Sequence, residues 1–300
     1  MRLHGVVLLS SLLLSAVGAC DEPTFAGVRV TLKGAKDVKN ITGCFGPTDD
    51  LVKVSYIQVV GQPVPVIRRD AIHGLPNLVD VILEDDNVTD IEPGAFRNLT
   101  YLYLIRIRNN NIRVIRAGVF ANLPVRELNL MNNRIEIIDP NAFDDLPNLL
   151  ILGLNENKIT RISNDWFKQS PRVANINLEK NYITTIPDRI LQNIRGVHVV
   201  KNVTIQTNIM LNDNLIRKIE DGAFDGPETL GWLFLHRNEI EQISEESLGS
   251  LKAIDWIRLD HNKLKCIPEK LVHISPKIVY YLQSNPLSEM CINKLNITTV

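Results

Sequence analysis

The sequence predicts an α/β repeat solenoid, a fold in which short parallel strands stack along one long axis. One pattern of apolar residues around an asparagine recurs about every 24 residues along most of the chain, and residues 149–163, LLILGLNENKITRIS, show it clearly. Each copy carries more inward-facing apolar residues than so short a unit could bury by itself. The hydrophobic content of 45% over 300 residues is therefore expected to fill a long strip of core in one elongated domain.

The apolar positions of one unit define its strand and its share of the core. In the clear copy they are alternating leucines, then the asparagine, then further apolar residues: Leu149, Leu152 and Leu154, Asn157, and Ile159, Ile162 and Phe167. The same frame begins nine times, at Val54, Leu78, Leu102, Val125, Leu149, Val173, Gln206, Leu230 and Ile254. Strands of successive units would lie about 4.8 Å apart, so only neighbouring units can cover each other's apolar side chains.

The asparagine position has a separate physical reason. The chain turns inward there and buries backbone donors and acceptors, and a carboxamide can both donate and accept a hydrogen bond. Gln62 and Asp86 occupy this position in the first two units, so the hydrogen bonding there is expected to differ from that of an asparagine. A phenylalanine slot follows in most units and is expected to be part of the core; it holds Phe96, Phe120, Phe143, Phe167 and Phe224, with Leu191 and Leu248 in two others.

The consensus LxxLxLxxNxIxxIxxxxFxxLxx resembles the leucine-rich repeat, in the 24-residue form typical of extracellular animal proteins. The resemblance covers roughly Val54 to Ser275. It implies a horseshoe with parallel β-strands on the concave face and an irregular or 3-10 convex side. The sequence is similar to secreted insect leucine-rich immune proteins and to Toll-like receptor ectodomains. This similarity implies recognition of microbial ligands or of other defence proteins.

The ends of the chain differ from the repeats. Residues 1–19 resemble a signal peptide, with Arg2, an apolar run and small residues before Cys20, so we expect export; Val17-Gly18-Ala19-Cys20 also loosely matches a bacterial lipoprotein cleavage box. Residues 20–53 are predicted to form an N-terminal cap, residues 54–275 the repeats and residues 276–300 a C-terminal cap. No later apolar run is long enough to span a membrane.

The four cysteines form two pairs, one near each end of the predicted solenoid. We expect disulfides between Cys20 and Cys44 and between Cys266 and Cys291, because a rod keeps its ends far apart. Each would close a loop of about 25 residues and stabilise the fold by roughly 3.5 kcal/mol in the chain-entropy model. No CxxC pair occurs and no histidine has ligand spacing from a cysteine, so the sequence suggests no metal site.

The period breaks noticeably once. From Val173 the next unit should start at Val197, but the frame resumes at Gln206, which leaves an insertion near residues 197–205. The later units stay in frame, so the extra residues are expected to form a loop on the convex side or along an edge. This loop is either a tolerated bulge or a contact for a partner.

The strand positions between the inward residues should point to the concave face. Trp232 and Trp256 occupy the same column in adjacent strands, and large aromatic residues beside arginine are typical of interface hot spots. The alternative is that these side chains only pack on one another as cross-strand pairs. We therefore predict one binding surface, which consists of Trp232, Phe234, His236, Trp256, Arg258 and His261.

Two further sets of surface residues are candidates. Arg106 and Arg108 form a secondary basic spot, but the acidic residues beside them are expected to neutralise it. If the source is eukaryotic, five Asn-x-Ser/Thr sequons could carry glycans. They are Asn40, Asn87, Asn98, Asn202 and Asn296.

These observations predict a secreted, non-enzymatic binding protein that recognises a protein or glycan with its concave surface, in innate immunity. The alternative is an extracellular matrix or developmental signalling adhesion module. No GxSxG, HExxH or Cys-His arrangement indicates catalysis, and no cofactor is suggested. The net charge of −1 gives no bulk attraction to nucleic acid. The expected partner is an extracellular protein or a microbial surface glycan, and both a monomer and a homodimer stay open.

Overall fold

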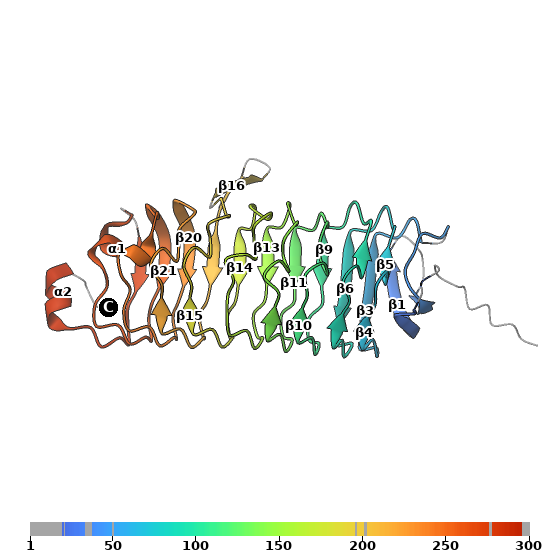
Figure 1. Ribbon diagram of the computed structural model, residues 1–300, viewed down its shortest axis with the longest axis horizontal. Helices are drawn as coiled ribbons and strands as arrows, with labels where there is room; N and C mark the ends of the chain where they lie inside the picture. Colours follow the sequence, from blue (N-terminus) through green and yellow to red (C-terminus); the bar gives the residue numbers. More distant parts are fainter. Residues whose placement is uncertain are drawn as a thin grey trace, which may run out of the picture.

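The structure is a computed structural model that describes residues 20, 22–33, 38–49, 51–195, 197–200, 203–275 and 278–295. It is an elongated stack of coils, and each coil adds one strand to a sheet that runs the length of the molecule (Figure 1). The predicted signal peptide, residues 1–19, lies outside the described residues. The predicted solenoid of parallel strands is confirmed.

The main sheet has 12 strands. From the N-terminal end they are β2 (Val38–Gly43), β1 (Phe25–Lys33), β3 (Tyr56–Val60), β6 (Asp80–Glu84), β9 (Leu104–Arg106), β11 (Glu127–Asn129), β13 (Ile151–Gly153), β14 (Asn175–Asn177), β18 (Asn208–Met210), β20 (Thr229–Phe234), β21 (Ala253–Arg258) and β22 (Val279–Tyr281). From β3 to β22 every pairing is parallel and in repeat register, as Leu128 opposite Leu152 illustrates. β22 extends the sheet beyond Ser275, where the sequence analysis ended the repeats.

The other side of the coils is held by short parallel pairs rather than by one sheet. These are β4 (Val66–Ile67) with β7 (Asp90–Ile91), β5 (Ile72–His73) with β8 (Phe96–Arg97), β10 (Val114–Ile115) with β12 (Ile137–Ile138), and β15 (Thr185–Ile186) with β19 (Lys218–Ile219). A single 3-10 turn, η1 (Glu246–Leu248), is present in the part of the chain that the structure describes. The backbone on this side is therefore satisfied mostly by hydrogen bonds between neighbouring coils.

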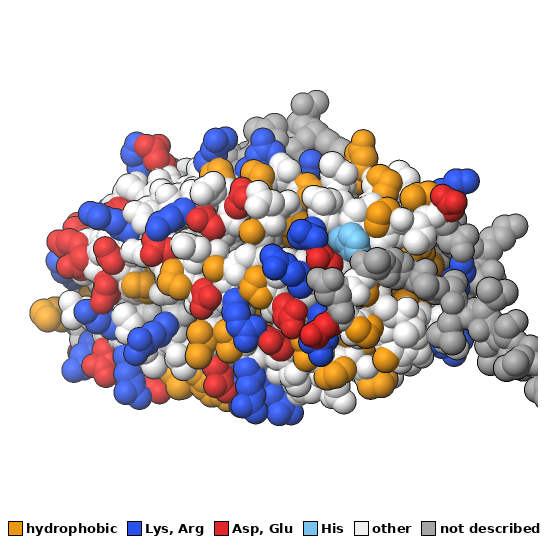
Figure 2. All heavy atoms as spheres, turned by 45° about the vertical axis from the view of Figure 1, so that its right-hand side comes forward, with side chains coloured by type: hydrophobic (Ala, Val, Ile, Leu, Met, Phe, Trp, Pro, Cys, Tyr) orange, Lys and Arg blue, Asp and Glu red, His pale blue; other side chains and the backbone are white. Residues whose placement is uncertain are grey.

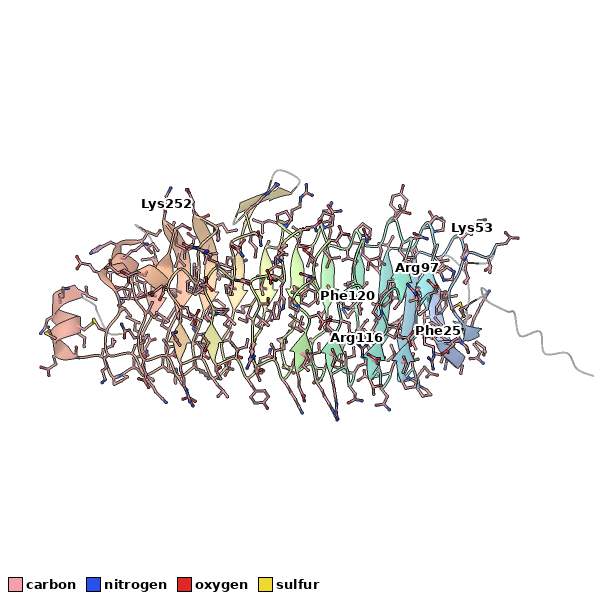
Figure 3. The ribbon with its side chains drawn as sticks, in the orientation of Figure 1. Phe25, Lys53, Arg97, Arg116, Phe120 and Lys252 are labelled. Atoms are coloured by element: carbon pink, nitrogen blue, oxygen red, sulfur yellow. A yellow bond between two sulfur atoms is a disulfide. The ribbon has the colours of Figure 1, made fainter. Side chains whose placement is uncertain are left out.

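The core is a continuous strip between these two sides. The phenylalanine slot stacks from coil to coil, with ring centroids 6.0 Å apart for Phe96 and Phe120 and 6.5 Å apart for Phe143 and Phe167. Phe25 and Phe120 lie inside the stack, whereas the lysines labelled in Figure 3 extend from its rim. Trp166 is also buried, against Phe143 and Phe167, so it belongs to the packing of two coils.

Both ends of the strip are closed. At the N-terminal end β1 and β2 form an antiparallel pair that continues the sheet, and Phe25 packs on Phe45 beneath it. At the C-terminal end lie two helices, α1 (Glu269–His273) and α2 (Glu289–Leu295). The two predicted disulfides are present, with Cα atoms 6.1 Å apart for Cys20–Cys44 and 5.5 Å apart for Cys266–Cys291.

The insertion near residues 197–205, expected to form a loop on the convex side or along an edge, is an antiparallel hairpin of β16 (Val197–Val200) with β17 (Val203–Gln206). Its sequence, VHVV and VTIQ, is rich in the β-branched residues that favour strands. β16 projects from one edge of the stack (Figure 1). Because β14 and β18 pair directly, the hairpin leaves the main sheet in register.

A column of buried asparagines ties each coil to the next. Asn157 is representative: its Oδ1 accepts the amide of Ile135 at 3.0 Å, while its Nδ2 donates to the carbonyls of Leu130 and Leu154, each at 3.0 Å. One side chain thus satisfies backbone groups in two coils. Buried backbone groups without partners would each cost about 1–3 kcal/mol, so this column decides whether the inward turn is stable.

Asp86 occupies the asparagine position in the second unit and satisfies it only in part. Its Oδ1 accepts the amide of Gln62 at 2.8 Å, but its Oδ2 is buried and has no hydrogen-bond partner. Burial, with the nearby charges of Asp85 and Glu84, raises the pKa of Asp86 to about 7, although the hydrogen bond from Gln62 acts to lower it. A carboxylate oxygen cannot donate to the carbonyls that an asparagine Nδ2 would reach.

We expect the stability of the protein to fall as the pH rises from about 4 to 7, since folded Asp86 holds a proton that an unfolded aspartate, of pKa about 3.9, has already released. Asp86→Asn restores both a donor and an acceptor, so it should raise the free energy of unfolding at pH 8 by about 1–3 kcal/mol. Urea midpoints at pH 5 and pH 8 measure the effect. Asp49→Asn, at an exposed position, is the control; an equal pH dependence in Asp86→Asn and the wild type would contradict the expectation.

Candidate binding surface

The aromatic residues singled out from the sequence lie together on the solvent-exposed face of the sheet. β20 and β21 pair in register, which places Trp232 opposite Trp256 and Phe234 opposite Arg258. The two tryptophans are 46% and 44% exposed, unusually high values for such large apolar side chains. Their outward direction follows from the inward Leu233 and Ile257, because side chains alternate along a strand.

Within this group the rings are stacked. Trp232 and Phe234 are nearly parallel, with centroids 5.8 Å apart and an angle of 7° between their planes. His236 meets Phe234 edge-on at 6.0 Å. Two aromatic side chains of β20 and the histidine that follows the strand therefore form a continuous row of rings, in which rotation of one ring would disturb the next.

The last strand extends the surface by two residues that the sequence analysis did not single out. β22 places Val279 beside Trp256 and Tyr281 beside Arg258. Val279 is exposed, and the guanidinium of Arg258 lies 5.6 Å from the Tyr281 ring centroid, a cation–π contact. The available signal was the spacing of Tyr280, Leu282 and Asn285, which repeats that of Ile257, Leu259 and Asn262. We call the resulting set the aromatic patch; its members are Trp232, Phe234, Trp256, Arg258, Val279 and Tyr281.

Arg258 is held in place by a buried carboxylate, that of Asp260. Its Nε and Nη2 atoms donate to the two oxygens of Asp260 at 3.0 and 2.9 Å, and His261 Nδ1 lies 3.1 Å from the same side chain. Burial acts to raise the pKa of Asp260, but the hydrogen bonds from Arg258 and His261 outweigh it and hold that pKa below its usual value. Asp260 therefore stays ionised and fixes the arginine in place.

His236 lies on the predicted column but is only 9% exposed. Glu84, Asn212 and Asp260 occupy the same column and are buried as well, because the chain turns inward directly after each strand. Burial, together with the positive charge of Arg258, lowers the pKa of His236. This histidine is therefore neutral at physiological pH, and its ring packs edge-on against Phe234.

The secondary basic spot is neutralised by its neighbours. Arg108 Nε lies 2.8 Å from Glu84, and Arg106 lies 4.0 Å from Glu84 and 3.7 Å from Glu127. Lysine, arginine and carboxylate side chains are likewise interspersed over the face in Figure 2. Arg106 and Arg108 therefore present little net positive charge to a ligand, whereas the aromatic patch stands out by its apolar character.

The middle of the sheet carries amide side chains that lead up to the patch. Asn208 Nδ2 donates to Asn175 Oδ1 at 2.9 Å, and Asn208 Oδ1 accepts the backbone amide of Trp232 at 2.9 Å. Gly231 permits this approach, because a Cβ there would lie 2.4 Å from Asn208 Oδ1. The position of Trp232 thus depends on an asparagine one strand away.

Three of the five sequons lie among the described residues, and all three asparagines are exposed: Asn40 on β2, and Asn87 and Asn98 in turns. Asn202 and Asn296 lie outside the described residues. No group of three or more His, Cys, Asp or Glu side chains that could hold a metal ion occurs within the ranges that the structure describes.

Comparison with known proteins identifies the class to which this fold and surface belong. The Leucine rich repeat family matches residues 76–125, 124–183 and 207–264, which together make up more than half of the chain. The chain belongs to the leucine-rich repeat family.

Similar proteins include chicken Tsukushi, 25% identical over 194 residues that represent 63% of this chain and 49% of that protein, and bovine asporin, 30% identical over 169 residues, 55% of this chain and 42% of asporin. Human leucine-rich repeats and immunoglobulin-like domains protein 1 is 31% identical over 127 residues, 42% of this chain and 12% of that protein. The chain spans about half or less of the length of these relatives.

The fold is similar to a chain in the structure of the Drosophila Toll–Spatzle complex, with a TM-score of 0.56, 19% identity and coverage of 81% of this chain and 36% of that one. The names of these proteins indicate no enzymatic activity. Within the described ranges, neither helix has the length and apolar character that crossing a bilayer requires.

We expect Gly231→Ala to displace Trp232 and to destabilise the protein by about 1–3 kcal/mol, because the added methyl group overlaps Asn208 Oδ1. Tryptophan fluorescence and urea denaturation measure the two effects. Gly153→Ala is the matched control, since its Cβ would meet the Asn129 side chain at no less than 3.3 Å. Equal effects of the two substitutions would show that Asn208 does not position Trp232.

Proposed function

We propose that this protein is a secreted, non-enzymatic binding protein whose aromatic patch contacts an extracellular protein. The observation that carries the proposal is the exposure of Trp232 and Trp256 in adjacent strands, beside an arginine held by a buried carboxylate. Aromatic residues and arginine contribute most of the binding energy in typical protein interfaces. A fixed arginine loses little conformational entropy on binding, which adds to the affinity.

The packing alternative, in which these rings only stabilise one another, accounts for part of the geometry. The contact of Phe234 with Trp232 and His236 stabilises β20. It leaves the tryptophans almost half exposed and gives no reason for Val279 to be exposed beside them. Contiguous apolar side chains exposed on a folded protein favour an interaction site.

The biological setting has two versions. One is innate immunity, with a defence protein or a microbial surface glycan as the partner; similarity to the Toll chain of the Toll–Spatzle complex is in keeping with a protein partner. The other is an extracellular matrix or developmental signalling adhesion module, which similarity to asporin and Tsukushi favours equally. A glycan partner would use the same ring faces, because sugar C–H groups pack on aromatic rings.

The test is a triple substitution of Trp232, Phe234 and Trp256 by alanine in the chain secreted from animal cells. We expect partner binding to weaken by at least about tenfold, which corresponds to about 1.4 kcal/mol. The matched control is the double substitution of Tyr101 and Tyr182, which are 70% and 51% exposed but lie outside the patch. Circular dichroism reports whether each variant is folded.

The binding assay is capture of proteins from extracellular fluid, run beside a glycan array and whole microbial cells. Capture of a host matrix protein alone would favour the matrix version, and binding to microbial surfaces or to defence proteins would favour the immune one. A folded triple variant that binds as the wild type does would show that the aromatic patch is not the site.

A further inference from the structure

One unit of the solenoid is a residue shorter than its neighbours. The unit that starts at Leu102 ends before Val125, whereas the units that start at Leu78 and Val125 end before Leu102 and Leu149. Alignment on the buried Phe96 and Phe120 places the missing residue after Leu123, where Leu123-Pro124-Val125 replaces Leu99-Thr100-Tyr101-Leu102. The chain here takes a shorter path into the next strand.

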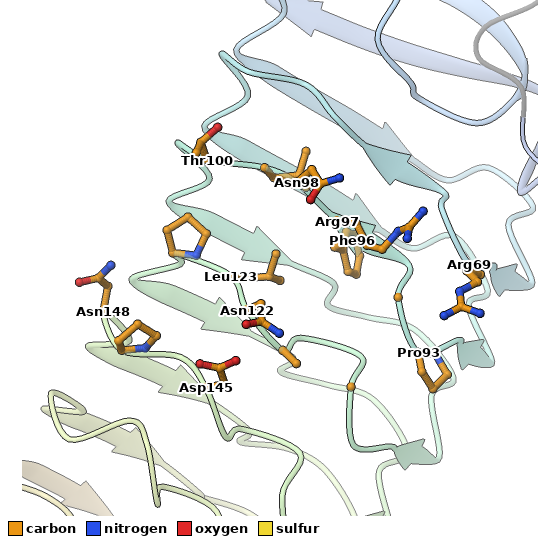
Figure 4. Close-up of a pocket in the computed structure, with 16 residues that line it drawn as sticks. Arg69, Pro93, Phe96, Arg97, Asn98, Thr100, Asn122, Leu123, Asp145 and Asn148 are labelled. Carbon is orange, nitrogen blue, oxygen red and sulfur yellow. The ribbon is translucent and has the colours of Figure 1, made fainter.

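A groove of about 970 Å³ lies over the shortened segment. Most of its lining comes from three successive coils, with Thr100 on one side, Leu123 in the middle and Asn148 on the other side (Figure 4), and Arg69 of the preceding coil completes it. The middle coil lacks a residue, so its chain cannot reach as far out as its two neighbours. This volume is at the upper end of the range of about 300–1000 Å³ for small-molecule sites.

The lining combines apolar rings with free polar groups. Pro93, Pro124 and Pro147 supply apolar faces. In the part of the chain that the structure describes, the side chains of Asn122 and Asp145 make no hydrogen bond or ion pair, which leaves an amide and a carboxylate free to bind an occupant. Sugar rings match this combination, because they present C–H faces together with hydroxyl and acetamide groups.

The rim of the groove holds a glycosylation sequon. Asn98 and Thr100 of Asn98-Leu99-Thr100 both line the groove, and both side chains are exposed. Asn98 has a φ of 53°, and Asn122 and Asp145, at the equivalent positions of the next two coils, have φ values of 59° and 62°. Asn98, Asn122 and Asp145 therefore share one backbone conformation, and all three line the same groove.

We propose that Asn98 carries an N-linked glycan whose innermost N-acetylglucosamine units lie in this groove. Attachment joins Asn98 Nδ2 to C1 of the first sugar of a lipid diphosphate-linked oligosaccharide; the C1–O bond to the diphosphate breaks, and the amide loses one proton as the lipid diphosphate leaves. The sugar rings then pack on the prolines and form hydrogen bonds with the side chains of Asn122 and Asp145. The shortened unit thus provides a groove, which we call the seat, for the glycan that is attached to the neighbouring coil.

The other described sequons lack such a seat. Asn87 is exposed and its Oδ1 accepts a hydrogen bond from Asn111 Nδ2 at 3.0 Å, but it does not line the groove. Asn40 lies on the exposed edge strand β2. A glycan at either residue would extend into water, so these two positions serve as internal references.

The first experiment uses the full chain secreted from animal cells. Mass spectrometry of glycopeptides should find Asn98 occupied, and a peptide:N-glycosidase should release its glycan from the folded protein at least about tenfold more slowly than that of Asn87 or Asn40, a ratio equivalent to about 1.4 kcal/mol. After denaturation all rates should be equal. An unmodified Asn98, or release at the rate of the reference sites, would overturn the proposal.

The second experiment separates the glycan from the residues that carry it. Thr100→Ala removes the sequon and should lower the melting temperature by about 2–4 °C, whereas Thr100→Ser keeps the sequon and should leave it unchanged. In protein made with glycosylation inhibited, Thr100→Ala and the wild type should melt together. A Thr100→Ala variant that melts with the glycosylated wild type would show that the glycan makes no contact with the protein.

The third experiment removes the seat and keeps the glycan. Insertion of one threonine between Leu123 and Pro124 restores the period and should abolish the slow release at Asn98. Should this variant fail to fold, the combined Asn122→Gly and Asp145→Gly substitutions test the same contact, since glycine accepts the positive φ of both positions. Slow release that persists after the groove is filled, or after both side chains are removed, would contradict the proposal.

Discussion

The structure depends on the fact that no coil can satisfy its own interior. The side chain of Asn157 donates to carbonyls of two neighbouring coils and accepts an amide from the first of them, and the same arrangement recurs at Asn181, Asn214, Asn238 and Asn262. Apolar burial pulls the coils together without fixing their spacing. The carboxamide fixes the spacing, because its hydrogen bonds require one separation and one orientation. Register along the whole sheet follows from this repeated contact.

The fixed register of the strands also explains why side chains on the outer face of the sheet are available for binding. Since Leu233 and Ile257 are fixed in the core, Trp232 and Trp256 must face water regardless of what surrounds them. The patch lies where β20 and β21 are six residues long, longer than the three-residue strands at the middle of the sheet. Longer strands offer a broader and stiffer platform, which is what a binding surface needs.

The structural features that follow from the repeat period could be predicted from the sequence. The features that depend on local backbone turns and on side-chain rotamers could not. The fold, the inward residues and the direction of Trp232 follow from spacing alone, and so does the pairing of the four cysteines once the ends are known to be far apart. The burial of His236 and the fork between Arg258 and Asp260 depend on how the chain turns after each strand and on rotamers, which spacing does not encode. Val279 was missed because its unit departs from the consensus.

The hairpin β16–β17 has a consequence for how such a protein changes over time. β14 and β18 pair across the point where it leaves the stack, so the chain can detour outward and return with no cost to the ladder on either side. A detour of another length or composition would meet the same permissive junction. This junction is therefore where evolution, or a protein engineer adding an epitope tag or a fluorescent reporter, can graft new sequence while the rest of the scaffold stays untouched.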